Sequence, residues 1–417
     1  MFKKLIAVGL GLTIAASVAG CGKKKVTFNS DEWGDMEITV AGYRLFNDDP
    51  LNYEYAAGAD KFTEEYGTKV NFMVGGGDGL DDDLVSAIMS GNPWDIQFVW
   101  GISVFPTTFC EELYTPITDY IDFDSNKMID KETVDGTFWK GEYYGVSNLN
   151  MQQVWYLCYN ETRFKEMGFK TPYEYYEEGK WNMDTYKELN AAANAKGAGS
   201  WSEIRRPHTG RKYMCDWDME KGEVTVTYDS PENTEWLSFW GELLQNKRYN
   251  VETKGYVSQR KPIMRDQVMP EMITRELENG ADSPDSIRYI FFPTKDGQPE
   301  SYLTDCHFMF PAGVEESRIP CAFMLACYMC DSKSQMTDEL YKNNMTSEDY
   351  ELWKKTLSNS VFLPRMFYEG AFAIGDQFIA DMKAGKSVAT HIAENTESLK
   401  AKAEEFNEKY AEGYEAK

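Results

Sequence analysis

Short stretches of alternating apolar and polar residues occur three times near the start of the chain. They lie at 38–40, 70–74 and 96–98, and each has the period of two that is typical of a β-strand. Between them, apolar residues recur at spacings of three and four, first at 55–66 and then at 80–88, as on one face of a helix. The alternation of strands and helices predicts a parallel sheet, with ligand-binding loops beyond the carboxyl ends of its strands.

A second unit of strands and helices follows from about residue 150. Asn182 and Ser230 each precede a helical pattern and are suited to cap it. We expect Trp236 and Trp240, which share the apolar face of the second of these helices, to lie in the core. The last roughly 70 residues read as mainly helical, and the final helix carries one apolar stripe. Strand patterns lie at 154–159 and 224–228 in this unit, and the patterns at 286–292 and 306–310 predict strands that cross back.

The N-terminus has the pattern of an export signal. A basic start, Met1 to Lys4, is followed by an apolar run at 5–20 that is too short to span a bilayer comfortably. The run ends in Val-Ala-Gly-Cys, which resembles the lipobox of bacterial lipoproteins, where the chain is cut before the cysteine and lipid is attached to it. We therefore expect a signal peptide at 1–20, lipidation at Cys21 and a flexible tether at 21–35. The alternative is an ordinary signal with a chance cysteine.

Composition narrows the classes of partner. The chain of 417 residues has 68 acidic and 43 basic side chains, a net charge of −25 that would repel a phosphate backbone, so nucleic acid is not expected as a partner. Aromatic residues make up 14% of the chain, and such rings are suited to stacking on apolar ligand faces. The three histidines have no spacing typical of a zinc site, and we expect neither a metal nor a cofactor.

Several motifs have a plain structural explanation. The pair Cys327 and Cys330 fits a CxxC pattern but ends an apolar helical run, so we interpret both as small buried residues rather than redox or metal ligands. The glycines at 75–79 lack the Lys-Ser/Thr ending of a phosphate loop and precede three aspartates.

Two further segments leave a choice open. The acidic positions from Asp122 to Asp130 partly match a calcium loop, but Lys127 replaces its glycine and Thr133 its closing glutamate. Either a calcium site or a capped surface loop is compatible with that pattern. The basic segment 205–212 is either a solvated loop or a contact for an anionic ligand or an acidic surface.

The order of these segments resembles the extracellular solute-binding proteins of bacterial ABC importers, in family 1, the class of maltose-binding protein. The resemblance covers nearly the whole mature chain. The segments that carry it are 36–42, 56–74, 90–96, 144–146, 155–164, 181–186, 310–313 and 385–387.

The resemblance implies a type II periplasmic-binding-protein fold: two α/β lobes, each a mixed or parallel sheet flanked by helices, joined by hinge crossovers. We place the N-lobe at 36–148 plus 300–332 and the C-lobe at 149–299 plus 333–417. The crossovers are expected near 148–153, 293–300 and 330–334. The ligand contacts implied by the family are Tyr43, Arg44, Trp100, Ser103, Asn150, Gln153, Trp201, Trp217, Phe367 and Tyr368. The local sequence places Trp217 in a turn-like stretch without apolar neighbours at helical spacing.

The predicted function is capture of a carbohydrate, most simply an oligosaccharide, between the lobes and its delivery to the transmembrane subunits of a permease. The protein is expected to be a monomer, lipid-anchored on the extracellular face of the cell membrane, and not an enzyme. The rival hypotheses are a secreted glycoside hydrolase, since 68 acidic residues always supply candidate carboxylate pairs, and a receptor for a non-sugar solute.

Overall fold

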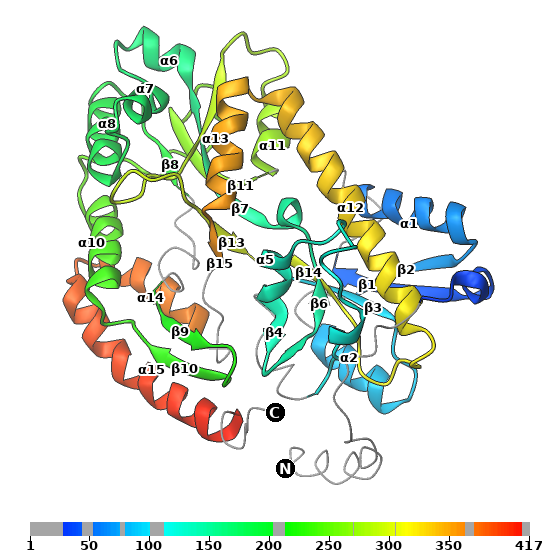
Figure 1. Ribbon diagram of the computed structural model, residues 1–417. Coiled ribbons are helices and arrows are strands. Elements are labelled where there is room, and N and C mark those ends of the chain that lie inside the picture. The colour runs from blue at the N-terminus through cyan, green and yellow to red at the C-terminus, as the bar shows by residue number, and fades with distance from the viewer. Residues whose placement is uncertain are drawn as a thin grey trace.

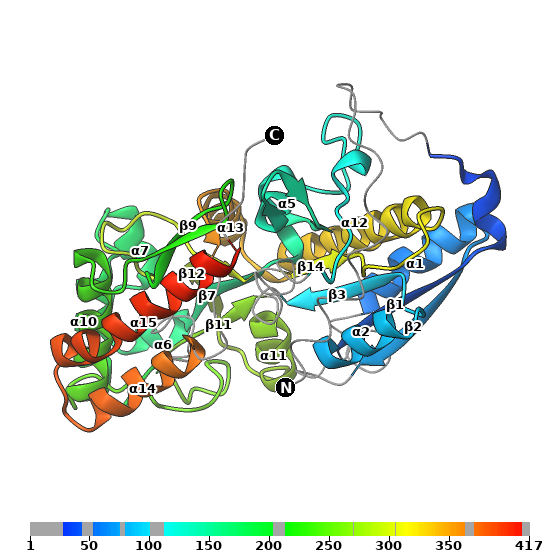
Figure 2. The same cartoon turned by 90° about the horizontal axis from the view of Figure 1, so that it is seen from below.

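The computed structural model describes residues 28–43, 53–75, 80–100, 112–202, 213–269, 271–304, 306–362 and 371–410. It confirms the predicted α/β class. Its two larger sheets lie in separate halves of the molecule, each flanked by helices, as Figure 1 shows with β1–β3 in one half and β7 and β11 in the other. Turned by 90°, the two halves lie beside each other, with α12 running along the first (Figure 2).

The first half is built on a five-stranded sheet in the order β2-β1-β3-β14-β6. Strand β1 is parallel to β2 and β3, as the alternating pattern predicted, whereas β14 is antiparallel to β3 and β6. The two predicted helices α1 and α2 follow β1 and β2 in the chain. The elements are β1 (Glu37–Tyr43), α1 (Tyr53–Tyr66), β2 (Lys69–Gly75), α2 (Leu80–Met89), β3 (Ile96–Trp100), α5 (Lys131–Val134), β6 (Gly145–Val146) and β14 (Cys306–Met309).

The long helix α12 (Ile319–Asn344) packs directly on α1. A Cβ atom added to Gly58 of α1 would lie 2.5 Å from the backbone oxygen of Tyr328, so the two helix backbones are in contact. Cys321, Cys327 and Cys330 are free thiols buried in this helix, which confirms their interpretation as small core residues. Burial raises the pKa of the Cys321 thiol to about 11, so little of it is a reactive thiolate at neutral pH.

The second half is built on a six-stranded sheet around β7, which is antiparallel to β11, β12 and β13. Asn182 and Ser230 cap α8 and α10 as predicted, because their side chains accept hydrogen bonds from the backbone of the first turn. The strands are β7 (Gln153–Asn160), β8 (Trp201–Ser202), β11 (Met264–Met269), β12 (Ile287–Phe291), β13 (Tyr302–Thr304) and β15 (Val361–Phe362). The helices around it are α6 (Glu161–Glu166), α7 (Pro172–Glu177), α8 (Met183–Ala195), α10 (Pro231–Gln245), α11 (Glu271–Asn279) and α13 (Ser347–Ser358).

Two C-terminal helices, α14 (Ala371–Lys383) and α15 (Val388–Tyr410), pack on α10. The predicted stripe of α15 is confirmed, since Ile392, Leu399, Ala403 and Phe406 are all buried. A hairpin of β9 (Cys215–Asp218) and β10 (Glu223–Val226) lies against α15. A second hairpin, β4 (Phe138–Trp139) with β5 (Glu142–Tyr143), extends from the first half.

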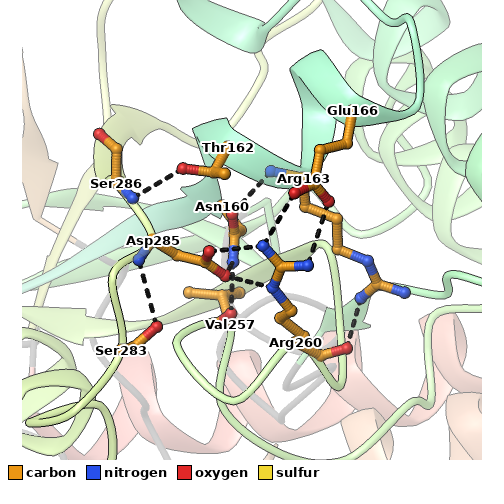
Figure 3. Close-up of polar contacts among 9 residues, drawn as sticks. All are labelled: Asn160, Thr162, Arg163, Glu166, Val257, Arg260, Ser283, Asp285 and Ser286. Atoms are coloured by element: carbon orange, nitrogen blue, oxygen red, sulfur yellow. Dashed lines mark hydrogen bonds and ion pairs between the residues drawn. The ribbon is translucent and has the colours of Figure 1, made fainter.

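An ion-pair network holds the end of β7 that lies farthest from the first half (Figure 3). Arg260 contacts the carboxylates of Asp285 at 2.6 Å and of Glu166 at 3.0 Å. Asn160, the last residue of β7, donates a hydrogen bond to the same Asp285 at 2.7 Å. Arg260 has a φ of 59°, an uncommon value for a side-chain-bearing residue, and these contacts compensate for that strain. The loops at this end are therefore tied to β7 and α6.

Candidate functional site

Within the described residues, the chain passes between the two sheets at three places. The first is the short helix η6 (Leu149–Met151), which joins β6 to β7, as predicted. The second lies between β13, which ends at Thr304, and β14, which begins at Cys306, and not at 293–300. That prediction was wrong because residues 302–304 still pair with strands of the second sheet, so the proposed lobe boundary at residue 300 also falls inside that sheet.

The third passage is α12 itself. Its first half, including Cys321 and Cys330, is buried in the core of the first sheet, whereas Tyr341 is buried in the core of the second half. Residues 330–334, where the crossover was predicted, lie inside this continuous helix.

The first two passages are joined by hydrogen bonds of one side chain, that of Gln152. The Gln152 amide oxygen accepts a hydrogen bond from the Cys306 backbone N–H at 2.8 Å, and its nitrogen donates to the Cys306 carbonyl at 3.1 Å. The Ser147 hydroxyl donates to the same carbonyl at 2.5 Å. Gln152 is only 2% exposed, so these bonds are shielded from competing water.

The first and third passages are joined by a separate contact. The Asn150 amide donates a hydrogen bond to the Ser334 hydroxyl of α12 at 3.0 Å. Beside it, the Asp130 carboxylate accepts a hydrogen bond from the Leu149 backbone at 2.7 Å, and burial raises the pKa of this carboxyl group. The first passage is therefore hydrogen-bonded to both of the others, and we call the residues that make these contacts the hinge node: Ser147, Asn150, Gln152, Cys306 and Ser334.

Strand register brings three of the predicted ligand residues to the edge where the sheets meet. Tyr43 and Trp100 end the neighbouring parallel strands β1 and β3, so both reach the same edge of the first sheet. Trp100 pairs with Cys306, while Gln153 pairs with Thr304, two residues earlier in the second passage. Trp100 and Gln153 therefore flank this passage from opposite sheets. The described structure gives the backbone of these three residues, and Arg44, Ser103, Phe367 and Tyr368 lie outside the described residues.

Trp201, in β8, is already in contact with a buried cation. The guanidinium carbon of Arg265 lies 4.5 Å from the centroid of the Trp201 ring and 4.8 Å from that of Tyr256. Arg265 is held by Glu276 at 3.3 Å, and both charged side chains are buried. This cation–π contact gives Trp201 a structural partner on one face of its ring.

Trp217 lies in strand β9 and not in the turn without apolar neighbours that the local sequence indicated. Its ring centroid is 5.9 Å from that of Trp139 and 5.4 Å from that of Phe406, both in edge-to-face geometry. Sequence spacing missed these neighbours because they come from segments about 80 and 190 residues away in the chain, which only the tertiary fold brings together.

The residues that sequence reasoning missed are Gln152, Ser147 and Ser334 of the hinge node. A signal was present for the first two, since the connector 147–153 is rich in hydroxyl and amide side chains and lies between two apolar strands. Ser334 gave no such signal, because a serine inside a long helix is usually exposed or bonded to its own backbone.

The calcium-loop positions do not converge on a common point. The Asp122 carboxylate accepts hydrogen bonds from the backbone of Asp124 and Ser125, and the Asn126 amide donates to the Cys327 sulfur at 3.3 Å. Asp130 is bonded to Leu149 as described above. These contacts fit the capped-loop alternative. In the part of the chain that the structure describes, no cluster of three or more His, Cys, Asp or Glu side chains is arranged to hold a metal ion.

Two further sequence features concern other parts of the chain. The basic segment 205–212 and most of the glycine run at 75–79 lie outside the described residues. Among the helices that are described, none combines the length and the apolar character needed to cross a bilayer.

Comparison with solved structures identifies proteins of the same fold. The cyclic α-maltosyl-1,6-maltose binding protein from Arthrobacter globiformis matches with a TM-score of 0.69 and 13% identity, over 89% of this chain and 99% of that one. The galacto-N-biose/lacto-N-biose I-binding protein of an ABC transporter from Bifidobacterium longum has a TM-score of 0.69 and 12% identity, over 91% and 99%. An ABC substrate-binding protein from Listeria monocytogenes, solved with cycloalternan, gives 0.63 and 16%, over 89% and 98%.

Comparison of the sequence assigns the family directly. No curated protein matches this chain. The family model described as bacterial extracellular solute-binding protein matches residues 57–338, about two thirds of the chain. That span includes the hinge node and the strands of both sheets other than β1 and β15. The chain therefore belongs to the bacterial extracellular solute-binding proteins.

Proposed function

We propose that this chain is the substrate-binding subunit of a bacterial ABC importer, and that it captures a carbohydrate between two lobes and delivers it to a membrane permease. The observation that carries the proposal is the hinge node. Three passages between two separate sheets are joined by a small group of hydrogen bonds, buried around Gln152 and half-buried at Asn150, which is the arrangement expected of lobes that rotate about a common hinge. The family match and the folds of the structural relatives support it.

The two lobes of this proposal follow the two sheets. The first comprises residues 36–148 together with the strand that begins at Cys306 and the start of α12, and the second comprises the six-stranded sheet and the C-terminal helices. The boundary after Thr304 replaces the one at residue 300. A solute held between them would contact both sheet edges at the second passage.

A carbohydrate is the favoured ligand, and an oligosaccharide its favoured form. The three solved proteins named above are described as binding, or were solved with, a cyclic maltosyl-maltose, lacto-N-biose and cycloalternan. Sugars offer C–H faces to aromatic rings and hydroxyls to amides and guanidinium groups. The contact set remains the proposed one: Tyr43, Arg44, Trp100, Ser103, Asn150, Gln153, Trp201, Trp217, Phe367 and Tyr368. Binding, closure and release require no covalent chemistry and no cofactor.

Lipid attachment at Cys21 completes the proposal. A lipid-anchored monomer outside the cell membrane would stay close to the permease after export. The tether of this proposal is 21–27 and not 21–35, because Ser30–Asp35 form a short 3-10 helix of the first half whose Trp33 is only 3% exposed. Membrane fractionation of cells that carry Cys21→Ala checks this point. Retention of the variant on the membrane, processed like the parent, would contradict the anchor.

The test of the binding function is a panel of mono- and oligosaccharides read by thermal unfolding and by solution scattering. A sugar present at 100 times its Kd should stabilise the protein by about 2.7 kcal/mol, because it binds the folded state only. The same sugar should reduce the radius of gyration if the lobes close on it. Chromatography of each mixture detects hydrolysis. A panel in which no sugar stabilises the protein, or in which one is cleaved, would overturn the proposal.

A further inference from the structure

The β4–β5 hairpin is a rigid projection of the first half. Its two-residue turn consists of Lys140 and Gly141, with φ values of 47° and 85°, as a tight hairpin of this kind requires. The base of the hairpin is tied to its own half, since the Tyr143 backbone N–H donates to the Thr118 hydroxyl at 2.8 Å and the Tyr143 hydroxyl donates to Asp135 at 2.9 Å.

The tip of this hairpin contacts the second half. The Lys140 backbone N–H donates to the Met219 carbonyl, in the turn between β9 and β10, at 3.1 Å. The Lys140 ammonium group donates to the backbone oxygen of Tyr410 at the end of α15. In Figure 1 the β4 hairpin and the β9–β10 hairpin face each other in the lower part of the molecule, below β7 and β13.

An aromatic side chain is buried at this contact. Trp139 is only 3% exposed and belongs to a buried cluster that contains residues of both halves, among them Val99 of the first and Trp240 of the second. Its ring centroid lies 5.9 Å from that of Trp217 and 6.3 Å from that of Phe406. A ring carried by one half is thus buried partly by side chains of the other, and separation of the halves would expose it to water.

The contact is also closely fitted. A Cβ atom added to Gly222, in the turn of the β9–β10 hairpin, would lie 2.8 and 2.9 Å from two carbons of the Trp139 ring. Real Cβ atoms do not come that close to another atom, so no side chain fits at residue 222 while the two hairpins touch.

We propose that these residues form a latch that holds the two halves together in the ligand-free protein, so that a solute enters only after the latch opens. The latch comprises Trp139 and Lys140 on the first half and Trp217, Met219, Gly222 and Phe406 on the second. Its role in solute entry rests on the proposed function, whereas its existence does not. The latch lies apart from the hinge node, so it sets the ratio of open to closed molecules without altering the passages themselves.

The test compares two glycine variants with the same backbone conformation. Gly222 and Gly168 both have a φ of 72°, so an alanine at either site experiences similar backbone strain, but nothing lies within 4 Å of a Cβ atom at Gly168. Backbone strain should therefore lower the melting temperature of both variants by a similar amount, and the clash with Trp139 should lower that of Gly222→Ala further. Only Gly222→Ala should open the latch, which solution scattering without any sugar would detect as a larger radius of gyration than that of the parent and of Gly168→Ala.

Trp139→Ala provides a second, independent opening variant, and it is read in the same way if Gly222→Ala does not fold. Equal radii for the parent, Gly168→Ala and the opening variants would overturn the latch, whether all were compact or all extended. If the opening variants expand while no sugar binds to any of the proteins, the latch stands and the proposed function fails. If sugars bind but the radii are equal, the proposed function stands and the latch fails.

Discussion

At the scale of single residues, buried polar side chains show how this fold accommodates titratable groups in its core. His391 is fully buried between two partners, with its Nδ1 atom 2.7 Å from the Asp381 carboxylate and its Nε2 atom 2.9 Å from the Tyr228 hydroxyl. The three residues come from α14, α15 and the segment before α10. This cluster therefore links the C-terminal helices to the rest of the second half.

The stability of the protein should depend on the protonation of His391. Burial lowers the pKa of His391, although the neighbouring Asp381 opposes this effect. The folded state therefore prefers the neutral ring, while the unfolded chain binds a proton near pH 6.5. Stability is complete above that value and is lost as the pH falls from about 6.5 through the folded pKa.

Urea melts at pH 7.5 and 5.5 measure this dependence in the parent and in His391→Gln. The variant should lose less stability between the two pH values than the parent does, because its side chain does not titrate. His307, which is buried and bonded to the Thr133 carbonyl, is present in both proteins and cancels in the comparison. An equal loss of stability in both proteins would show that His391 does not control the pH dependence of stability.

At the scale of elements, helix α10 shows how apolar residues at helical spacing in the sequence form one buried face in the structure. Its N-terminus is capped by Ser230 and begins with Pro231. Trp236 and Trp240 lie on its buried face, and the Trp240 ring is stacked on Phe292 with centroids 5.4 Å apart. This face packs against the residue that follows β12, and both tryptophans lie in the core as the sequence predicted.

Trp240→Ala should therefore destabilise the fold by about 3–5 kcal/mol, through the loss of a large buried ring and the cavity that remains. The control is Ser238→Ala on the exposed face of the same helix, which should change stability by less than about 0.5 kcal/mol. Urea melts of both variants test this. Sugar affinity in the folded fraction of Trp240→Ala should equal that of the parent, and a loss of binding without a loss of stability would place this ring in the binding site instead.

At the scale of the whole molecule, the two halves are joined in two different ways. The hinge node connects them through short hydrogen bonds around Cys306, and the latch connects them through the Trp139 ring. The directional hydrogen bonds of the hinge node hold the passages in a defined arrangement, whereas an aromatic contact between hairpins can separate and form again. This division suits the proposed closing and reopening of the two lobes.

Gln152→Ala should weaken the hinge node. The substitution leaves the Cys306 backbone N–H without its side-chain acceptor in a buried place, so a loss of about 1–3 kcal/mol is expected. Gln335→Ala is the matched control, since that amide bonds to Asp331 on the exposed surface of α12 at 2.7 Å. Urea unfolding measures both, and hydrogen exchange at residues 147–153 and 306–309 should accelerate in the first variant only. Equal stability of the two variants would show that Gln152 does not stabilise the hinge node.

Much of the architecture could be predicted from local patterns. The period of two in β1–β3, the period of 3.6 in α1 and α15 and the caps at Asn182 and Ser230 are properties of neighbouring residues, and the structure confirms each of them. The cysteines of α12 were assigned correctly for the same reason, because an apolar helical run identifies its own core.

Contacts between distant segments were outside the reach of those patterns. The crossover was placed at 293–300 because no local pattern shows that 302–304 pair with β7, and Trp217 was placed in a turn because its neighbours come from β4 and α15. The candidate site has the same limitation: sequence indicated the connector that holds Gln152, but not its bond to Cys306. By itself, therefore, the sequence determined the elements and the family, since periodicity, caps and segment order are local and additive. Only the tertiary structure decided strand register, the position of the hinge and the pairing of the hairpins, because these depend on which of many compatible surfaces are buried against one another.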